Sequence, residues 1–363
     1  MARLTLTLMR HAECQVVVER GAVLDLAGLW RPEWEAAAVI GDENVIALHG
    51  GRVRSLLETV AQKLAVLGFP PGEASKTRAT KEKLEDRLLA EGFGRGTCVV
   101  ALGGGVSLDL AGFVAATYMR GVAHVNVPTS LLAQVDAGIG GKTGVDTSYG
   151  KNLVGAFHQP AAVVVDPELL ETLPAGEWRN GLAEMVKTAV VADGELFSWM
   201  EGHIEALTVP GRLDVHPIAR CVEAKCDVAR EDETDGGRRA ILNFGHTIGH
   251  AIESASSFAI PHGVAVAMGM VVEARLAVAL TGLPEEHAER VEAILGKLGL
   301  APFPRVPFQA IRPFLAVDKK NRAGEVRMAL PAGIGIMARA ASGEWTHTTT
   351  PSRIEEAYAL HLR

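Results

Sequence analysis

The chain has 363 residues, of which 48% are hydrophobic and 22% charged, and this composition excludes a largely disordered protein. Lys and Arg number 36 against 43 Asp and Glu, so the net charge of −7 argues against a general binder of DNA or of anionic membranes. Aromatic residues make up only 5%, too few for a platform that stacks single-stranded nucleic acid. At about 150 residues per domain, the length indicates two domains.

Residues 1–174 alternate short apolar runs with helical patterns, which predicts βαβ units around a parallel sheet. The expected strands are residues 15–19, 36–40, 97–102, 124–127 and 161–165. The expected helices are residues 53–67, 77–91 and 108–119. Beyond Pro174 the expected helices are residues 176–190, 196–207, 215–230, 246–256, 264–280 and 285–298. The sequence therefore predicts an α/β domain over residues 1–174 and a mainly α-helical domain over residues 175–363.

The cysteines and the N-terminus indicate the cellular location. The four cysteines form no CxxC pair and are expected to be reduced thiols: Cys14, Cys98, Cys221 and Cys226. Residues 1–10 alternate Leu and Thr, which predicts a strand rather than a signal peptide. The longest apolar run, residues 263–272, is too short to span a bilayer. We therefore expect a cytoplasmic protein.

A glycine turn follows the expected strand 97–102 and opens the next helix. Gly103, Gly104 and Gly105 allow backbone N–H groups to approach a diphosphate closely, and a helix N-terminus favours negative charge. The turn does not match the GxGxxG fingerprint, and the alternative is a tight turn that needs positive φ. Asp42 also follows a strand, where it predicts either a hydrogen bond to a ribose or a simple helix N-cap.

The segment 134–159 combines glycines with cations. Lys142, Lys151 and Asn152 lie on glycine-rich backbone, a composition that suits a polyanionic ligand. The glycines lack the Walker A spacing, because Asp136 stands where the first glycine is required. The alternative is a long surface loop with solvated lysines, but glycines and cations in one segment favour the ligand.

A candidate metal site lies in the second half of the chain. His246 and His250 stand four residues apart on one helix face, and His262 opens another helix. Glu184 lies in an otherwise apolar helical segment, where an unpaired carboxylate is costly and a cation would resolve that cost. From spacing alone we select Glu184, His246 and His250 as an open zinc site. The alternative is an ion pair of Glu184 with Lys187.

Basic and amide side chains accompany these candidate ligands along the sequence: Lys187, Lys225, Arg239, Asn243, Lys319 and Lys320. Clustered Lys and Arg beside a metal suit a substrate that carries a phosphate and a carboxylate. Each lysine alone would be a solvated surface residue, so the prediction depends on the cluster.

Together these motifs resemble the 3-dehydroquinate synthase family of sugar-phosphate cyclases. The matching segments are residues 71–77, 101–109, 118–121, 127–130, 134–145, 150–160, 180–187, 242–253 and 261–263. Segments 150–160 and 242–253 resemble this family more than its relatives that make valiolone or deoxy-inosose skeletons. The resemblance implies an NAD-binding α/β domain, an α-helical domain, and an active site in the cleft between them.

The resemblance also implies roles for individual residues. It replaces the spacing-based metal set with Glu184, His246 and His262, and it makes His250 an acid/base residue that contacts phosphate. The implied catalytic residues are His250, Lys142, Asn243 and Arg239. The implied substrate contacts are Arg120 (reaching across a dimer interface), Asp136, Lys142, Asn152, Lys187, Lys225, Arg239, Asn243, His250 and one of Lys319 and Lys320. The implied NAD contacts are Asp42, Glu73, Lys76, Gly104, Gly105, Val106, Asp109, Thr129, Ser130, Lys142, Lys151 and Thr172.

The implied reaction converts 3-deoxy-D-arabino-heptulosonate 7-phosphate into 3-dehydroquinate and phosphate, with NAD and one divalent ion, zinc or cobalt, as cofactors. NAD would oxidise a ring hydroxyl, phosphate would leave by elimination, and re-reduction, ring opening and aldol closure would follow. The alternatives are another sugar-phosphate cyclase, of the aminodehydroquinate, valiolone or deoxy-inosose type, and an NAD- and metal-dependent polyol dehydrogenase. A homodimer without nucleic-acid or membrane partners is expected.

One residue departs from the family pattern, because Asp235 stands where the family usually has Glu. Asp is shorter than Glu by about 1.5 Å, and proton transfer needs close approach. We therefore expect Asp235 to organise its loop and Arg239 rather than to transfer protons.

Overall fold

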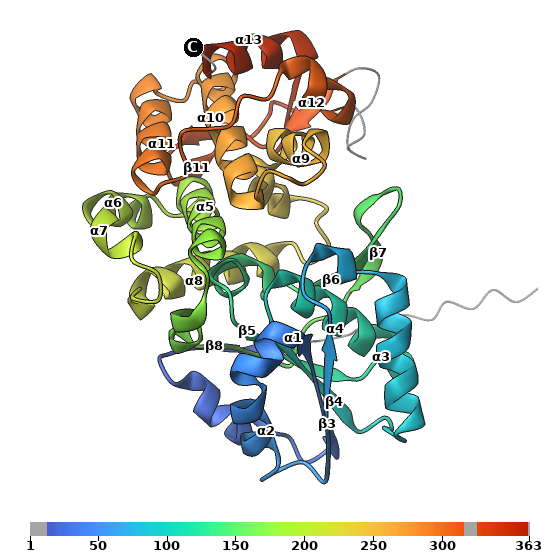
Figure 1. The fold of residues 1–363 in the computed structure, drawn as a ribbon. Helices are drawn as coiled ribbons and strands as arrows, with labels where there is room; N and C mark the ends of the chain where they lie inside the picture. Colours follow the sequence, from blue (N-terminus) through green and yellow to red (C-terminus); the bar gives the residue numbers. More distant parts are fainter. Residues whose placement is uncertain (1–12, 316–324, 362–363) are drawn as a thin grey trace, which may run out of the picture.

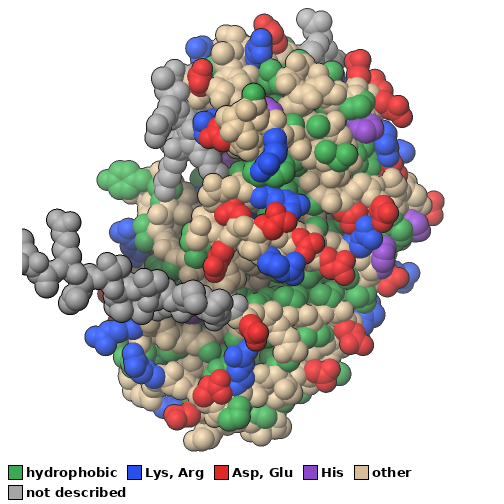
Figure 2. Space-filling model, turned by 180° about the vertical axis from the view of Figure 1, so that it is seen from behind, with side chains coloured by type: hydrophobic (Ala, Val, Ile, Leu, Met, Phe, Trp, Pro, Cys, Tyr) green, Lys and Arg blue, Asp and Glu red, His purple; other side chains and the backbone are tan. Residues whose placement is uncertain are grey.

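The computed structural model describes residues 13–315 and 325–361. The first half of the chain forms a parallel sheet with helices around it, and the second half forms a helical body that lies above the sheet in Figure 1. The predicted fold class is thereby confirmed. The strand expected over residues 1–10 lies outside the described residues. Seen from behind, acidic and basic side chains are interspersed over both halves (Figure 2).

The sheet has six described strands, all parallel, in the order β1-β8-β5-β4-β2-β3. Their bounds are β1 (Gln15–Val18), β2 (Ala36–Asp42), β3 (Lys63–Phe69), β4 (Thr97–Gly103), β5 (Ala123–Pro128) and β8 (Ala162–Val165). Ala38 packs into the apolar core on one face of the sheet, and its neighbour Val39 packs into the core on the other face. Burial on both faces explains the continuous Val- and Ala-rich runs in the sequence.

Helices around the sheet follow the sequence prediction with one exception. Their bounds are α1 (Glu43–Val45), α2 (Gly51–Leu57), α3 (Arg78–Ala90) and α4 (Gly105–Thr117). The helix expected over residues 53–67 is wrong, because α2 ends at Leu57 and β3 begins at Lys63. β3 pairs in parallel with β2, residue for residue, and buries Leu67 and Phe69. Pairing with the sheet therefore overrides the local helical periodicity.

The segment 134–159 forms a hairpin rather than a long loop. A short π-helical turn, η5 (Ala133–Ala137), leads into the antiparallel strands β6 (Lys142–Thr147) and β7 (Gly150–Phe157). The hairpin packs against α4 and reaches from the sheet toward the helical half (Figure 1). Lys142 and Lys151 thus stand on two strands of one element.

The second half is helical, as expected, with short strands near its end. The helices are α5 (Ala175–Ala192), α6 (Gly194–Gly202), α7 (Ile204–Leu207), α8 (Val215–Glu231), α9 (His246–Ala255), α10 (His262–Thr281), α11 (Glu285–Lys297), α12 (Phe308–Leu315) and α13 (Pro351–His361). The strands are β9 (Val326–Met328), β10 (Pro331–Gly333), β11 (Ile336–Met337) and β12 (His347–Thr349). With 20 residues and a mean hydropathy of 1.8, α10 as a whole could cross a membrane by length and composition, but 72% of its apolar window is buried inside the structure. That burial is typical of a core helix.

α9 and α10 cross closely at the residue before α9 begins. Gly245 has a φ of +79°, and a Cβ there would lie 2.5 Å from Met270 Cγ of α10. Glu273 of α10 accepts hydrogen bonds from the N–H groups of Gly245 and Ile248, at 2.6 and 3.2 Å. The carboxyl group of Glu273 therefore satisfies backbone donors that the first turn of a helix leaves unpaired, and it ties the start of α9, at His246, to α10.

The chain reverses its direction of travel across the sheet between β2 and β4. From β2 it moves outward to β3, whereas β4, β5 and β8 follow one another on the other side. Ligands of open α/β sheets bind outside the carboxyl ends of the strands at such a point. Asp42 ends β2 and Gly103 ends β4, so two features selected from the sequence stand at this position.

Candidate active site

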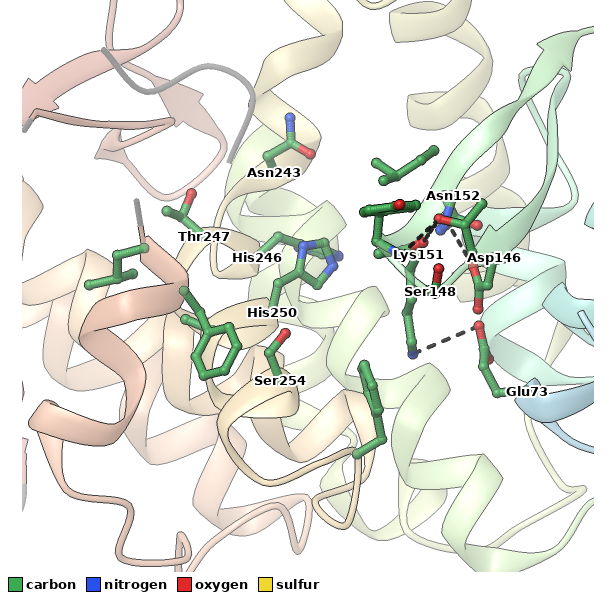
Figure 3. Close-up of a pocket in the computed structure, with 18 of the residues that line it drawn as sticks. Glu73, Asp146, Ser148, Lys151, Asn152, Asn243, His246, Thr247, His250 and Ser254 are labelled. Atoms are coloured by element: carbon green, nitrogen blue, oxygen red, sulfur yellow. Dashed lines mark hydrogen bonds and ion pairs between the residues drawn. The ribbon is translucent and has the colours of Figure 1, made fainter. Parts of the chain in front are cut away.

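A cleft of about 1400 Å³ separates the hairpin from α9. Figure 3 shows His246 and His250 on one side, from α9, with Asp146, Lys151 and Asn152 of the hairpin across from them. The predicted site residues that line this cleft are Glu73, Lys151, Asn152, Asn243, His246 and His250, and Asp235 lines it as well. The hairpin and the helical half thus contribute opposite walls.

Glu184 of α5, His246 of α9 and His262 of α10 come together from three helices. Glu184 Oε1 lies 3.5 Å from His246 Nε2 and 3.2 Å from His262 Nε2, and the three potential ligand atoms lie within 4.8 Å of one another. A carboxylate with two imidazoles suits zinc and related divalent ions. The structure does not assemble the spacing-based set, because His250 is 60% exposed and its Nε2 lies 4.0 Å from Glu253. His246 and His250 share a helix face, but the third position belongs to His262.

Glu184 also forms the ion pair that was the alternative to a metal role. Its side chain is 1% exposed, and Lys187 Nζ lies 2.5 Å from its Oε2, the oxygen on the other side from the two imidazoles. Burial alone would raise the pKa of Glu184, but Lys187, His246 and His262 hold it well below its usual value. An ionised carboxylate is thus available between a lysine and two histidines.

Asp136 joins two buried ammonium groups. It forms ion pairs with Lys187 of α5 and with Lys225 of α8. Burial opposes the ionisation of Asp136, yet the two lysines lower its pKa. For Lys225, burial lowers the pKa to about 8, although Asp136 acts in the opposite direction. The predicted substrate contacts Asp136, Lys187 and Lys225 therefore form one cluster, which shares Lys187 with Glu184.

Arg239 is held by backbone carbonyls from two segments. The side chain is 1% exposed, and it donates from Nη1 to Glu233 O at 2.7 Å and from Nη2 to Gly140 O at 2.9 Å. Arg239 lies in the short 3-10 helix η7 (Arg238–Asn243), whose last residue, Asn243, lines the cleft. Two carbonyls thus fix the guanidinium between the helical half and the segment that precedes β6.

The loop before Arg239 is organised by Asp232, and this corrects the role expected for Asp235. Asp232 accepts hydrogen bonds from the backbone N–H groups of Gly236, Gly237 and Arg239, at 3.0, 2.7 and 2.9 Å. Asp235 has a φ of +63° and instead accepts a hydrogen bond from Lys142 Nζ at 2.8 Å. Asp235 therefore holds the ammonium group of Lys142, a predicted catalytic residue, and does not organise the loop.

The glycine turn and Asp42 lie together at the carboxyl ends of β4 and β2. Gly103 has a φ of +149°, and a Cβ there would lie 2.5 Å from Ser107 Oγ. Asp42 caps α1 by accepting from two backbone N–H groups, and Ser107 Oγ donates to its other oxygen at 3.3 Å. Thr129 and Ser130 directly follow β5, the next strand of the sheet. Gly104 and Gly105 begin α4, so backbone N–H groups of a 13-residue helix face this edge.

Lys76 connects this edge to the hairpin. Its ammonium donates to Asp109 of α4 and to Asn152 of β7, at 2.5 Å in each case. Burial raises the pKa of Asp109, although Lys76 opposes that rise. Asn152 was predicted as a substrate contact, and in the structure its side chain accepts a hydrogen bond from Lys76, a residue predicted to contact NAD.

The remaining predicted residues are more scattered. Lys151 lies 3.7 Å from Glu73 and 3.5 Å from Glu253, and Thr172 lies 3.1 Å from His49 Nε2. Arg120 is exposed at the C-terminal side of α4, the end opposite to the glycine turn. Lys319 and Lys320 lie outside the described residues. Val106 lies in the first turn of α4.

Three acidic residues around the site were missed from the sequence: Asp232, Glu253 and Glu273. Glu273 stands in an apolar helix, the signal that selected Glu184, and it could have been found in the same way. Glu253 follows His246 by seven residues, which places it on the same face of α9. Asp232 lies four residues before a Gly-Gly pair, in a polar segment of the kind that many surface turns share, so no specific signal distinguished it.

Solved structures place the chain in a class of cyclases. The 2-epi-5-epi-valiolone synthase from Streptomyces hygroscopicus subsp. jinggangensis, with NAD⁺ and Zn²⁺ bound, is 29% identical with a TM-score of 0.87, and the match covers 99% of both chains. A 2-deoxy-scyllo-inosose synthase complexed with carbaglucose-6-phosphate, NAD⁺ and Co²⁺ is also 29% identical, with a TM-score of 0.85 over 93% of this chain and 94% of that chain. The architecture is therefore that of the dehydroquinate synthase-like cyclases.

Sequence comparison defines the family within this class. The profile described as 3-dehydroquinate synthase N-terminal matches residues 66–180, and the profile described as 3-dehydroquinate synthase C-terminal matches residues 181–321. A curated 3-dehydroquinate synthase from Halorhodospira halophila is 46% identical over 312 residues, which cover 81% of this chain and 88% of that protein. The chain belongs to the 3-dehydroquinate synthase family, whose members are carbon–oxygen lyases, and the resemblance seen in the sequence is confirmed.

Proposed function

We propose that this enzyme converts 3-deoxy-D-arabino-heptulosonate 7-phosphate into 3-dehydroquinate and phosphate, a step of the shikimate route to aromatic amino acids. The observation that carries the proposal is that the Glu184–His246–His262 group and the Asp136–Lys187–Lys225 cluster share Lys187. A divalent ion and an anionic substrate would thus meet at one place. The 46% identity to a 3-dehydroquinate synthase, against 29% to the valiolone and deoxy-inosose synthases, supports this substrate over theirs.

NAD and one divalent ion, zinc or cobalt, are the cofactors of the proposed reaction. The carboxylate and two imidazoles of Glu184, His246 and His262 are a fitting donor set for the ion. The glycine turn at the start of α4 and Asp42 at the end of β2 fit a dinucleotide, because they stand where the chain reverses across the sheet. When bound, NAD supplies a reversible hydride acceptor and the ion supplies a Lewis acid.

The protein's own residues bind the substrate and move protons. Lys187 and Lys225 bind its anionic groups, and Arg239 presents a guanidinium whose direction is fixed by two carbonyls. His250 is exposed on the cleft wall, where its imidazole can exchange a proton with the substrate or its phosphate. Lys142, paired with Asp235, and Asn243 complete the proposed catalytic group.

A homodimer in the cytoplasm is part of this proposal. Arg120 lies at the end of α4 remote from the glycine turn, about 20 Å away for a helix of this length. An exposed arginine in that place would serve the active site of a second copy. Interspersed charges on the face seen in Figure 2 suit a protein without nucleic-acid or membrane partners.

The function is tested by mixing the purified protein, NAD and Zn²⁺ with the heptulosonate phosphate. We expect one phosphate and one 3-dehydroquinate per substrate consumed, with no accumulation of NADH, because the nicotinamide is oxidant and then reductant in one turnover. Stoichiometric NADH would indicate a polyol dehydrogenase instead. Turnover of sedoheptulose 7-phosphate or glucose 6-phosphate, with the heptulosonate phosphate left intact, would indicate one of the other cyclases.

A further inference from the structure

Glu253 is a buried carboxylate at the cleft that the proposed reaction does not use. It lies on α9 and is 4% exposed. Its Oε2 lies 3.2 Å from His262 Nδ1 and 4.0 Å from His250 Nε2, and its Oε1 lies 3.5 Å from Lys151 Nζ. One carboxylate therefore meets groups from α9, α10 and the hairpin.

The contact with His262 decides which ring nitrogen faces Glu184. Because a carboxylate only accepts, Nδ1–H of His262 donates to Glu253, and Nε2 is directed at Glu184 Oε1, 3.2 Å away. His246 is arranged in the same way, since its Nδ1 lies 3.2 Å from the carbonyl oxygen of Phe244 while its Nε2 faces Glu184. Both imidazoles thus turn the same nitrogen toward the proposed ion site.

Lys151 balances the charge of Glu253 from across the cleft. Its Nζ also lies 4.3 Å from the centre of the Phe258 ring, on the loop that follows α9. A buried carboxylate without a cation is costly, so this ammonium helps to keep Glu253 ionised beside His262. The hairpin and the helical half are joined through this pair.

We propose that Glu253 is a positioning residue that orients His262 for metal binding, with Lys151 as its counter-ion. The inference rests on the proposed metal set of Glu184, His246 and His262. Partners of this kind fix the tautomer and the ring direction of a histidine ligand, and their loss weakens metal binding by about 10–100-fold. Glu253 touches neither the ion nor the substrate in this arrangement.

The test uses metal-free full-length protein titrated with Co²⁺ against a chelator, so the readouts are affinity and the visible absorption of the bound ion. Glu253→Met removes the acceptor and keeps the volume, and we expect Co²⁺ affinity to fall by about 10–100-fold with an altered spectrum. Glu253→Gln keeps an acceptor but loses the charge, so its affinity is expected between those of Glu253→Met and wild type, at least threefold below wild type. The matched control is Glu201→Gln, a carboxylate paired with Arg290 away from the cleft, which should bind Co²⁺ like wild type.

Wild-type affinity and spectrum in Glu253→Met would overturn the inference. If that variant does not fold, Glu253→Gln decides, and an affinity less than threefold below that of wild type has the same consequence. His246→Ala separates this failure from a failure of the metal set, because loss of Co²⁺ there, with unaffected binding in the Glu253 variants, refutes only the role of Glu253. Retention of Co²⁺ in His246→Ala would instead refute the metal set itself.

Discussion

Asp232 and Asp235 stand on one loop and stabilise different partners. Asp232 accepts from three backbone N–H groups, including that of Arg239, while Asp235 pairs with Lys142. Asp232 thus fixes the backbone at Arg239, whereas Asp235 holds the side chain of Lys142. A charge on Asp235 is matched by one ammonium, and an amide could still accept that hydrogen bond.

We expect Asp232→Ala to lower kcat/KM by about a hundredfold, because a displacement of about 1 Å at Arg239 has an effect of that order.

Asp235→Asn should lower turnover by less than about tenfold, and Asp235→Glu should be nearly neutral, because each retains an acceptor for Lys142. Steady-state kinetics with metal content and thermal unfolding as controls measure both. A thousandfold loss in Asp235→Asn, with folding and metal unchanged, would show that this acid transfers protons.

Lys225 should impose an alkaline limit on substrate capture. Burial lowers its pKa to about 8, so the ammonium is charged below that pH and neutral above it. Because an anionic substrate needs the charge, kcat/KM should decline as the pH rises through about 8, following the pKa of the free enzyme. Lys225→Arg keeps the charge at all these pH values, so the decline should move to higher pH. An identical profile in the two proteins would assign the decline to another group.

At the scale of elements, the α9–α10 crossing determines how two of the proposed metal ligands approach each other. Gly245 lets the backbone of one helix start against the side of the other, and Glu273 satisfies the first N–H groups of α9. Burial raises the pKa of Glu273 to about 8, although the N–H groups of Gly245, Ile248 and Thr247 act in the opposite direction. The crossing is therefore sensitive to the ionisation of one carboxyl.

Glu273→Gln should remove a pH-dependent part of the stability. A carboxyl whose pKa is raised on folding, from 4.5 to about 8, stabilises the fold fully below the lower value and loses that contribution as the pH rises to the higher one. Over this window the free energy of unfolding of wild type should fall, relative to Glu273→Gln, by about 1.4 kcal/mol per pH unit. Urea unfolding of the metal-free proteins at pH 5, 6.5 and 8 measures the difference. A difference that stays constant across these three pH values would contradict the assignment.

The same elements show what could be predicted from the sequence. Short apolar runs predicted most strands of the sheet, and apolar residues at helical spacing predicted the helices of the second half. Both patterns arise because burial of fixed faces determines how often apolar residues recur. The helix expected over residues 53–67 was wrong because β3 is stabilised by pairing with β2. β2 lies more than twenty residues earlier in the chain, outside the short window from which periodicity is read. The metal group could be selected only in part, since His262 reaches the site through the crossing of α9 and α10 and no spacing encodes that contact.

At the scale of the whole molecule, the sheet half and the helical half carry separate candidate binding groups, and both halves contribute walls to one cleft. The glycine turn belongs to the first half, and Glu184, His246 and His262 belong to the second. The hairpin connects the two sides through Lys151, which lies near Glu73 and Glu253. A ligand that binds only the sheet half, or only the helical half, should therefore stabilise the protein on its own.

We expect NAD and Zn²⁺ each to raise the Tm of the metal-free protein, because a ligand at about 100 times its Kd adds about 2.7 kcal/mol to the folded state. His246→Ala should abolish the Zn²⁺-dependent part of this shift and turnover with it, while the NAD-dependent part remains. Differential scanning calorimetry with each ligand alone measures both. A full Zn²⁺ shift in His246→Ala would place the ion elsewhere.

The burial of Lys187 and Lys225 has a consequence for how the substrate responds to salt. Their side chains are 1% and 9% exposed, so dissolved ions have little access to the charges that would receive the phosphate and carboxylate. Screening acts over about 8 Å in physiological solution and weakens exposed pairs most. Capture of a substrate that carries both a carboxylate and a phosphate should accordingly tolerate wide changes in ionic strength, unlike recognition by a surface patch of arginines.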